Sequence, residues 1–393
     1  MIKFKKGLNK TKIFLSFSTH MVTDTYASFI VGLIPILAVK LELSLFFVGI
    51  LTSVNFISNN LAQPAFGYLS DKYGIRYFMI AGPLVASIFI SILGVSPNYW
   101  SILIFLFLGN LGVAAIHPPT AATASHAGGS RKGFINSIIS FGGTVGFSAG
   151  SLFVILIINK LGLKFTPLAA IPGIIMALVL IKFDPSIFLT ETQKVKTSFI
   201  RKIKSLKKTR LILLLLIIFA SYSRDLTVLS MLTFMPLYFT NQGVKLINFG
   251  YIILVFIIIG GIGGLFAGYY SDKIRKRTTV IQAGLIISVP FFYLIFKVPL
   301  SMSIILFILA GFFATSTLPL CIRVAQDIFP GNVSLASSMV MGVSGGIAAA
   351  TVILVGKIAD NIGMVRTINY VLIIPILASL LLLLFPLVRS RYR

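Results

Sequence analysis

Two histidines and an aspartate in the first third of the chain have the residue types and spacing that can carry a proton. His20 and Asp24 are four residues apart, so a helix places them on one face. His117 precedes Pro118 in a later apolar stretch and is expected at a similar depth. Imidazole and carboxylate groups can exchange protons near neutral pH when their surroundings tune them. We therefore predict a proton-coupling site of Asp24, His20 and His117, with a structural role for His117 beside the proline as the alternative.

Arg224 and Asp225 form a second polar site, in the middle of another apolar stretch. Neighbouring residues on a helix point about 100° apart, so we expect these two not to pair simply with each other. A guanidinium binds carboxylates and phosphates through two parallel hydrogen bonds. Arg224 and Asp225 are therefore predicted to contact the substrate, with an anionic group on Arg224. The alternatives are a structural ion pair and a contact between Arg224 and Asp24 across the chain.

The elements that position these residues must be membrane helices. The chain has 393 residues, of which 57% are hydrophobic and 11% are charged, and its mean hydropathy is +1.00. These values are typical of an integral membrane protein. An apolar stretch of about 20 residues spans a bilayer as a helix. We predict twelve spans, at 13–39, 45–69, 78–95, 100–122, 134–158, 165–183, 211–239, 249–270, 279–296, 302–322, 334–355 and 368–388.

The distribution of positive charge along the chain indicates its orientation in the membrane. A net charge of +25 would suggest nucleic acid as the partner of a soluble protein. Here lysine and arginine gather in alternate connections, which predicts that these lie in the cytoplasm with both termini. The most basic connection, 184–210, is predicted to be a linker against anionic lipid headgroups. The first apolar stretch is too long for a signal peptide. We therefore expect a multi-pass protein of the cytoplasmic (inner) membrane that binds no nucleic acid.

The linker separates two halves that repeat each other. Asp24 and Asp225 are 201 residues apart, and five further pairs share this offset. These pairs are Pro35 and Pro236, Gly67 and Gly268, Asp71 and Asp272, Lys72 and Lys273, and Pro118 and Pro319. Transporters are commonly built from internal repeats of this kind. We therefore predict an all-α protein of two six-helix halves, 1–183 and 211–393, joined by the linker 184–210.

A short motif after the second span indicates a family. Gly67, Asp71, Lys72, Gly74 and Arg76 fit the pattern G-x-L-x-D-[RK]-x-G-x-[RK]. This pattern resembles the signature loop of the major facilitator superfamily. The resemblance implies two six-helix halves around a central cavity lined by spans one, four, seven and ten, which is exposed alternately to each side. The five motif residues are predicted to control this conformational change.

Further motifs resemble the fosmidomycin-resistance branch of that superfamily. They are Thr19-His20 with Asp24, Gln63-Pro64, Ile116-His117-Pro118, the Phe234–Tyr238 segment and the Gln326–Pro330 segment. The branch is described as drug exporters driven by proton entry, and export is implied only by resemblance. Span five departs from the exporter pattern, because Ser151 stands where a proline is expected, although its glycines are present.

The function predicted from these features is secondary active transport. The leading hypothesis is proton-coupled efflux of small drugs or anionic metabolites; the alternatives are proton-coupled uptake of an organic anion and a membrane receptor that transports nothing. The sequence contains no nucleotide-binding motif and no nucleophile elbow, so we expect no enzyme activity and no cofactor. Three scattered histidines and one cysteine argue against a metal site. The expected partners are a small-molecule substrate, protons and the lipid bilayer, and we expect a monomer.

Overall fold

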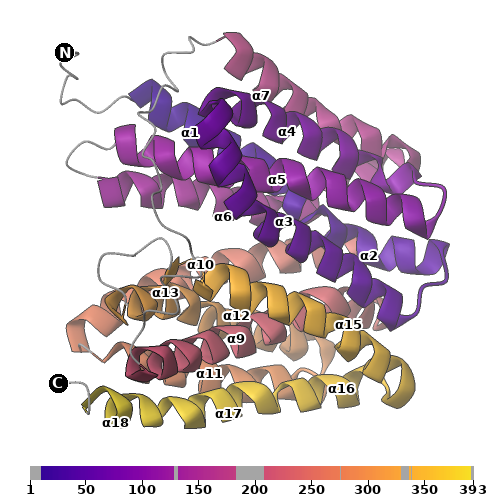
Figure 1. Ribbon diagram of the computed structural model, residues 1–393. Coiled ribbons are helices and arrows are strands. Elements are labelled where there is room, and N and C mark those ends of the chain that lie inside the picture. The colour runs from indigo at the N-terminus through magenta and orange to yellow at the C-terminus, as the bar shows by residue number, and fades with distance from the viewer. Residues whose placement is uncertain are drawn as a thin grey trace, which may run out of the picture. The chain divides into compact units, whose positions relative to one another are not determined.

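The computed structural model describes residues 10–127, 132–182, 208–274, 276–328, 336–337 and 339–390. This part of the chain is helical throughout, apart from short turns (Figure 1). The predicted basic linker, 184–210, lies almost entirely outside the described residues and stays a prediction.

The twelve predicted spans are confirmed. Twelve helices or helix pairs of the described residues are long and apolar enough to cross a membrane, and each overlaps one predicted range. In the first half they are α1 (Lys10–Ala27) with α2 (Phe29–Lys40), α3 (Leu45–Tyr73), α4 (Ile75–Ser91), α5 (Tyr99–Ala127), α6 (Lys132–Leu161), and η3 (Leu163–Ala170) with α7 (Ile171–Lys182). In the second half they are α9 (Lys208–Asn241), α10 (Leu246–Ile274), α11 (Arg277–Leu294), α12 (Leu300–Thr315) with α13 (Thr317–Ile328), η5 (Met339–Val343) with α15 (Ser344–Ile362), and α16 (Met364–Val371) with α17 (Ile373–Leu382) and α18 (Leu384–Ser390).

The helices form two compact units. The first contains Met1–Leu41 and Ser58–Lys194, and the second contains Glu42–Ile57 and Val195–Arg393. In the first unit α1 packs on α5 and α6, while α4 packs on α5 and α7; in the second, α9 packs on α13, α15 and α17. Helix α3 is shared, because its first turns, up to Ile57, belong to the second unit. The predicted division into 1–183, 184–210 and 211–393 stays a prediction.

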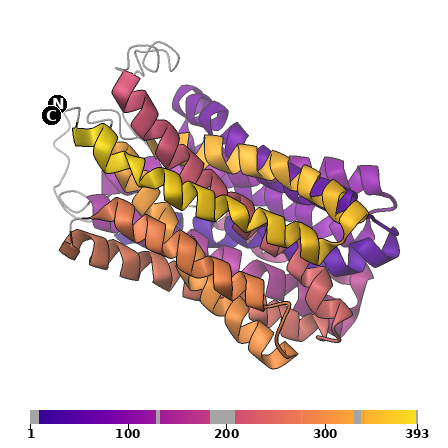
Figure 2. The same ribbon diagram turned by 90° about the horizontal axis from the view of Figure 1, so that it is seen from below.

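Three helix breaks of the second unit follow one rule. The chain leaves regular α-helix at Ser316, Leu372 and Leu383, each three residues before a proline, namely Pro319, Pro375 and Pro386. Proline has no backbone N–H, and its ring crowds the carbonyl four residues earlier. Each proline therefore interrupts the helix of its span without ending the span. Figures 1 and 2 both show α16, α17 and α18 following one another as a single yellow rod.

Glycines of α6 let it lie directly against α1. A Cβ atom on Gly146 would stand 1.9 Å from the carbonyl oxygen of Met21, and one on Gly150 would stand 1.8 Å from that of Thr25. Only glycine allows two membrane helices to approach so closely. Ser151, the residue found in place of an expected proline, donates its hydroxyl hydrogen to the carbonyl of Ser28 at 2.8 Å. Ser28 is the break between α1 and α2, and its carbonyl also accepts the N–H of Val31, so Ser151 adds a second donor that a proline could not supply.

Candidate proton and substrate site

The first unit brings His20, Asp24 and His117 together. His20 Nε2 lies 3.2 Å from Asp24 Oδ2, and His117 Nε2 lies 3.5 Å from Asp24 Oδ1. The two imidazole rings meet edge to face, with centroids 5.0 Å apart. Side-chain exposure is 11% for His20, 13% for Asp24 and 22% for His117. The sequence prediction that these three residues share one site therefore has a matching geometry, although their proton-coupling role is a proposal.

Each of the three elements at this site has a separate part. Helix α1 supplies His20 and Asp24 from successive turns of one face. Helix α5 supplies His117, one residue before the consecutive prolines 118 and 119. Helix α6 supplies no side chain: a Cβ atom on Gly143 would stand 2.6 Å from both Asp24 Oδ2 and His20 Nε2. The contact between His20 and Asp24 therefore depends on a glycine at this position.

The second nitrogen of His20 fixes its tautomer. Nδ1 lies 3.0 Å from the carbonyl oxygen of Ile139 on α6. A carbonyl oxygen only accepts hydrogen bonds, so Nδ1 must carry the hydrogen. In neutral His20 the bare Nε2 then faces Asp24 Oδ2, which also only accepts when ionised. Two lone pairs in contact repel, so the pair requires a cation between them.

A proton on either atom meets this requirement. On Nε2 it makes an imidazolium that donates to the carboxylate; on Oδ2 it makes a carboxylic acid that donates to Nε2. The ligand atoms of His20, Asp24 and His117 also lie within 4.8 Å of one another, a spacing that a metal ion can bridge. The scattered histidines predict no metal site. The fold nevertheless brings two of them to one carboxylate.

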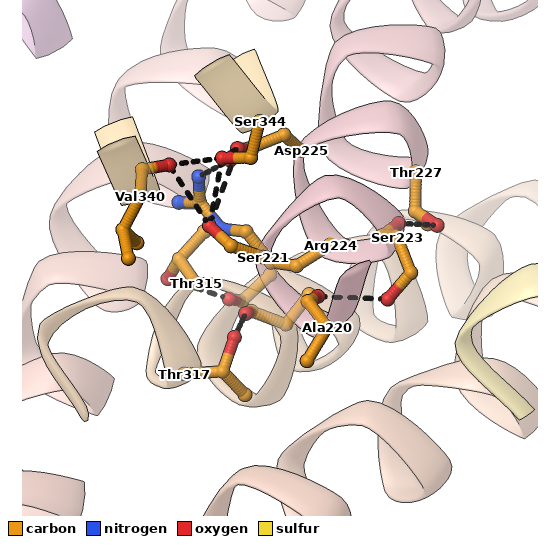
Figure 3. Close-up of polar contacts among 12 residues, drawn as sticks. Ala220, Ser221, Ser223, Arg224, Asp225, Thr227, Thr315, Thr317, Val340 and Ser344 are labelled. Atoms are coloured by element: carbon orange, nitrogen blue, oxygen red, sulfur yellow. Dashed lines mark hydrogen bonds and ion pairs between the residues drawn. The ribbon is translucent and has the colours of Figure 1, made fainter. Parts of the chain in front are cut away.

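In the second unit Arg224 pairs with Asp225, and our expectation that they would not pair is wrong. Arg224 Nη1 donates to Asp225 Oδ1. The long arginine side chain bends back across the 100° between neighbouring positions. Asp225 Oδ2 lies 2.7 Å from Ser344 Oγ and 3.4 Å from Ser221 Oγ (Figure 3). The carboxylate is therefore surrounded by donors.

Arg224 keeps unused donors. Its Nε atom is buried and makes no hydrogen bond to the residues that the structure describes. An unsatisfied buried N–H of a charged group costs more than about 1–3 kcal/mol, so this atom is suited to an acceptor from a ligand. Cys321 of α13, a buried thiol, lies near this ion pair. A contact between Arg224 and Asp24 stays a prediction.

Most of the chain matches one known protein family. The profile of the Major Facilitator Superfamily matches residues 14–334. The chain belongs to this superfamily. The superfamily consists of membrane transporters, so the chain is a multi-pass membrane transporter rather than an enzyme.

Two curated relatives and one solved structure agree with the superfamily assignment. The fosmidomycin resistance protein of Escherichia coli (strain K12) is 24% identical over 366 residues, which cover 92% of this chain and 89% of the relative. An uncharacterised transporter of Bacillus subtilis (strain 168), YfnC, is 26% identical, with 93% and 90% covered. The inward-facing, unoccupied crystal structure of a bacterial homologue of the human lysosomal transporter Spinster has a TM-score of 0.80 at 15% identity and covers 98% of both chains. That likeness shows the fold alone.

The superfamily signature motif spans the last turns of α3, the connecting Gly74 and the first turn of α4. Gly67 packs against Pro118, to which a Cβ atom would come within 3.6 Å, and Gly74 has a φ of +105°, which favours glycine. Arg76 donates to the carbonyl of Ile181 in the last turn of α7 at 3.0 Å. Lys72 is exposed and lies over the ring of its neighbour Tyr73. The side chain of Asp71 lies outside the described residues.

The second copy of the signature loop makes a different network. Arg277, which is 201 residues after Arg76, donates to Asp272 and to Asp327, at 2.8 Å each. Arg323 Nε lies 3.6 Å from the same Asp327. The two copies therefore use equivalent arginines for different partners.

The offset of 201 residues also relates the two polar sites, which sequence reasoning had missed. His20 corresponds to Ser221, Asp24 to Asp225, Ile139 to Val340 and Gly143 to Ser344. In both units the first of these residues bonds the carbonyl of the third and contacts the carboxylate of the second. Applying the offset to the neighbours of Asp24, instead of only to rare residues, would have revealed Ser221 and Ser344.

Proposed function

We propose that this transporter is a proton-coupled antiporter of the cytoplasmic membrane that exports small anionic molecules by alternating access. His20, Asp24 and His117 bind the coupling proton. Arg224 binds the anionic group of the substrate, and Asp225 holds Arg224 in place. Both termini lie in the cytoplasm.

The observation that carries the proton assignment is the contact between His20 Nε2 and Asp24 Oδ2 at 3.2 Å. The tautomer fixed by the Ile139 carbonyl leaves no hydrogen in this contact unless one extra proton binds. Among the described residues, the titratable groups that face Asp24 are His20 from its own helix and His117 from α5, and α6 presents Gly143. The pair therefore accepts a proton without a permanent cation competing for Asp24.

The anion assignment is supported by the donors of Arg224. Nη1 is committed to Asp225, and the buried Nε has no protein partner within the described residues. Guanidinium donors bind carboxylate and phosphonate oxygens in a fork. The fosmidomycin resistance protein is a relative over most of the chain. Fosmidomycin, which carries an anionic phosphonate, is therefore the first probe.

Reconstitution into proteoliposomes tests the proton assignment. Asp24→Asn is expected to exchange labelled fosmidomycin for unlabelled fosmidomycin down its gradient but to lose accumulation driven by a proton gradient. Glu42→Gln, which neutralises an exposed carboxylate in the same way, is expected to keep both activities. Full proton-driven accumulation by Asp24→Asn would remove Asp24 from the proton path. Loss of transport after treatment with a metal chelator would show that a metal ion, rather than a proton, occupies the site.

The orientation is tested with single cysteines. Cys321 is the only cysteine and is buried, so the chain is a ready background for labelling. Lys273→Cys and Asn361→Cys place exposed thiols at the C-terminal ends of spans eight and eleven. Because these two spans are expected to cross the membrane in opposite directions, the two thiols are expected on opposite sides. In intact cells an impermeant maleimide is expected to label the second variant and to spare the first. The reverse pattern would contradict cytoplasmic termini.

A further inference from the structure

The two repeat-equivalent sites differ at one position on α6 and α15. Gly143 faces Asp24 in the first unit, and Ser344 faces Asp225 in the second. In both sites a carbonyl of the preceding turn, from Ile139 or Val340, accepts a hydrogen bond from α1 or α9. At equivalent backbone positions, the first site therefore has no side chain beside the carboxylate and the second has a hydroxyl.

Glycine at position 143 leaves just enough room for the contact between His20 and Asp24. A Cβ atom there would stand 2.6 Å from Asp24 Oδ2 and from His20 Nε2, and 2.9 Å from His20 Cδ2. The atoms in the way are the ends of side chains, so a larger residue is accommodated by moving the imidazole. A side chain at position 143 would therefore separate His20 from Asp24.

Serine at position 344 places a hydroxyl beside the carboxylate of Asp225, and the Val340 carbonyl of its own helix is a second acceptor for the single hydroxyl hydrogen. Ser344 Oγ lies 2.7 Å from Asp225 Oδ2, and Arg224 holds Oδ1. A serine hydroxyl donates one hydrogen and does not ionise, and arginine stays charged at every physiological pH. Asp225 is therefore contacted by groups whose own charge does not change, while the described side chains that contact Asp24 gain and lose protons.

We propose that Gly143 and Ser344 are positioning residues that give the two carboxylates different roles. Asp24 exchanges a proton, and Asp225 holds Arg224. Gly143 allows a proton to pass between Asp24 Oδ2 and His20 Nε2 with no other bond changed. Ser344 holds the carboxylate of Asp225 in place and so keeps the guanidinium of Arg224 oriented toward the substrate. This inference rests on the proposed proton and anion sites.

The test of Gly143 introduces serine, the residue at the equivalent position of the second repeat. In Gly143→Ser the new hydroxyl is expected beside Asp24 Oδ2, as that of Ser344 lies beside Asp225 Oδ2, and His20 is expected to be displaced. Difference infrared spectroscopy of the purified protein during a pH titration is the readout, because a carboxyl that gains a proton acquires its own absorption band. The wild type is expected to show a band that Asp24→Asn removes. Gly143→Ser is expected to lose this band and proton-driven accumulation, and to keep fosmidomycin exchange.

Gly342→Ser is the control for adding a serine to a membrane helix, because a Cβ atom there meets nothing within 4 Å. It is expected to retain the band. If Gly143→Ser titrates like the wild type, the inference about Gly143 is overturned even when the proposed function holds. If the wild type has no band that depends on Asp24, the proposed proton site itself fails. Gly143→Ala is the second variant, and it is expected to lose the band without supplying a donor.

Ser344 is tested by anion binding. Ser344→Gly is expected to weaken fosmidomycin binding about fivefold, since the net value of one hydrogen bond is lost from the anchor of Arg224. Its infrared band from Asp24 is expected to stay. Ser344→Thr keeps the hydroxyl and is expected to restore wild-type affinity. Equal affinities for the wild type and Ser344→Gly would overturn the assignment of Ser344, and so would a failure of threonine to rescue.

Discussion

The carboxylate of Asp360, near the end of α15, caps the first turn of α3. Its Oδ1 accepts the backbone N–H of Leu45 at 2.8 Å, and its Oδ2 accepts that of Phe46 at 3.0 Å. The first N–H groups of a helix have no partner within the helix, and a carboxylate there also complements the helix dipole. Gly356 brings the two helices together, because a Cβ atom on it would stand 2.3 Å from the Leu45 carbonyl oxygen. The first turns of α3 are thereby fixed to the second unit.

Removing this cap is expected to destabilise the protein. Asp360→Ala leaves two N–H groups without an acceptor, at an expected cost of about 0.5–1 kcal/mol for an exposed cap. Thermal unfolding in detergent measures the loss as a lower midpoint. Asn361→Ala, at the next and equally exposed position, is the control. Equal midpoints for the two variants would show that Asp360 does not hold α3.

The hydroxyl of Ser151 is expected to stabilise the break in the first span. Ser151→Ala removes a hydrogen bond between α6 and the Ser28 carbonyl, and interhelical hydrogen bonds in membranes are worth about 0.6 kcal/mol on average. Ser148 is the control, since it is also buried on α6 but donates to its own helix at Val145. Unfolding in a denaturing detergent should therefore begin earlier for Ser151→Ala than for Ser148→Ala. The reverse order would contradict this role.

Arg224 is expected to recognise an anion by its shape as well as its charge. Arg224→Lys keeps the charge but loses the planar fork, so fosmidomycin binding should weaken about tenfold or more. Binding is measured by isothermal titration calorimetry on purified protein. Arg323→Lys, at an exposed arginine, is the control and should bind normally. Unchanged affinity in Arg224→Lys would reduce Arg224 to a structural partner of Asp225.

The signature loop is expected to control the conformational equilibrium and not substrate recognition. Asp71→Asn should leave fosmidomycin affinity unchanged and slow transport, because charge at this loop favours one of the two conformations. Asp272→Asn, the equivalent change in the second copy, breaks one exposed ion pair with Arg277 and should have a smaller effect, since such pairs contribute little. A lower affinity in Asp71→Asn with unchanged conformational populations would argue against this role.

Fosmidomycin binding is expected to weaken as the pH falls, as antiport requires. Antiport requires proton and substrate to exclude each other, so fosmidomycin affinity should fall as the pH falls and Asp24 and His20 bind their proton. By linkage, fosmidomycin should release a proton when it binds. Asp24→Asn should remove both effects, which proton-release measurements in weakly buffered solution can detect. Affinity that rises as the pH falls would instead indicate proton-coupled uptake.

The sequence predicted the spans well and the local breaks less well. Twelve apolar stretches give twelve spans, because a bilayer demands helices of a set length and apolar composition. The helix break at Ser316 was not predicted, although Pro319 marks it, because a proline in a membrane helix can be tolerated without a break. Helix α5 keeps Pro118 without one.

The sequence by itself determined the membrane class, the family signature and the residues able to carry charge inside a membrane. Composition and motif spacing are properties of the chain, and they hold in any conformation. Only the tertiary structure decided the partners. It placed His117 beside Asp24 although 93 positions separate them in the chain. It also folded Arg224 onto its neighbour Asp225, against the expectation from helix geometry. The contact between His117 and Asp24 depends on how closely α1, α5 and α6 approach, and the packing of glycines such as Gly143 against a neighbouring helix sets that distance.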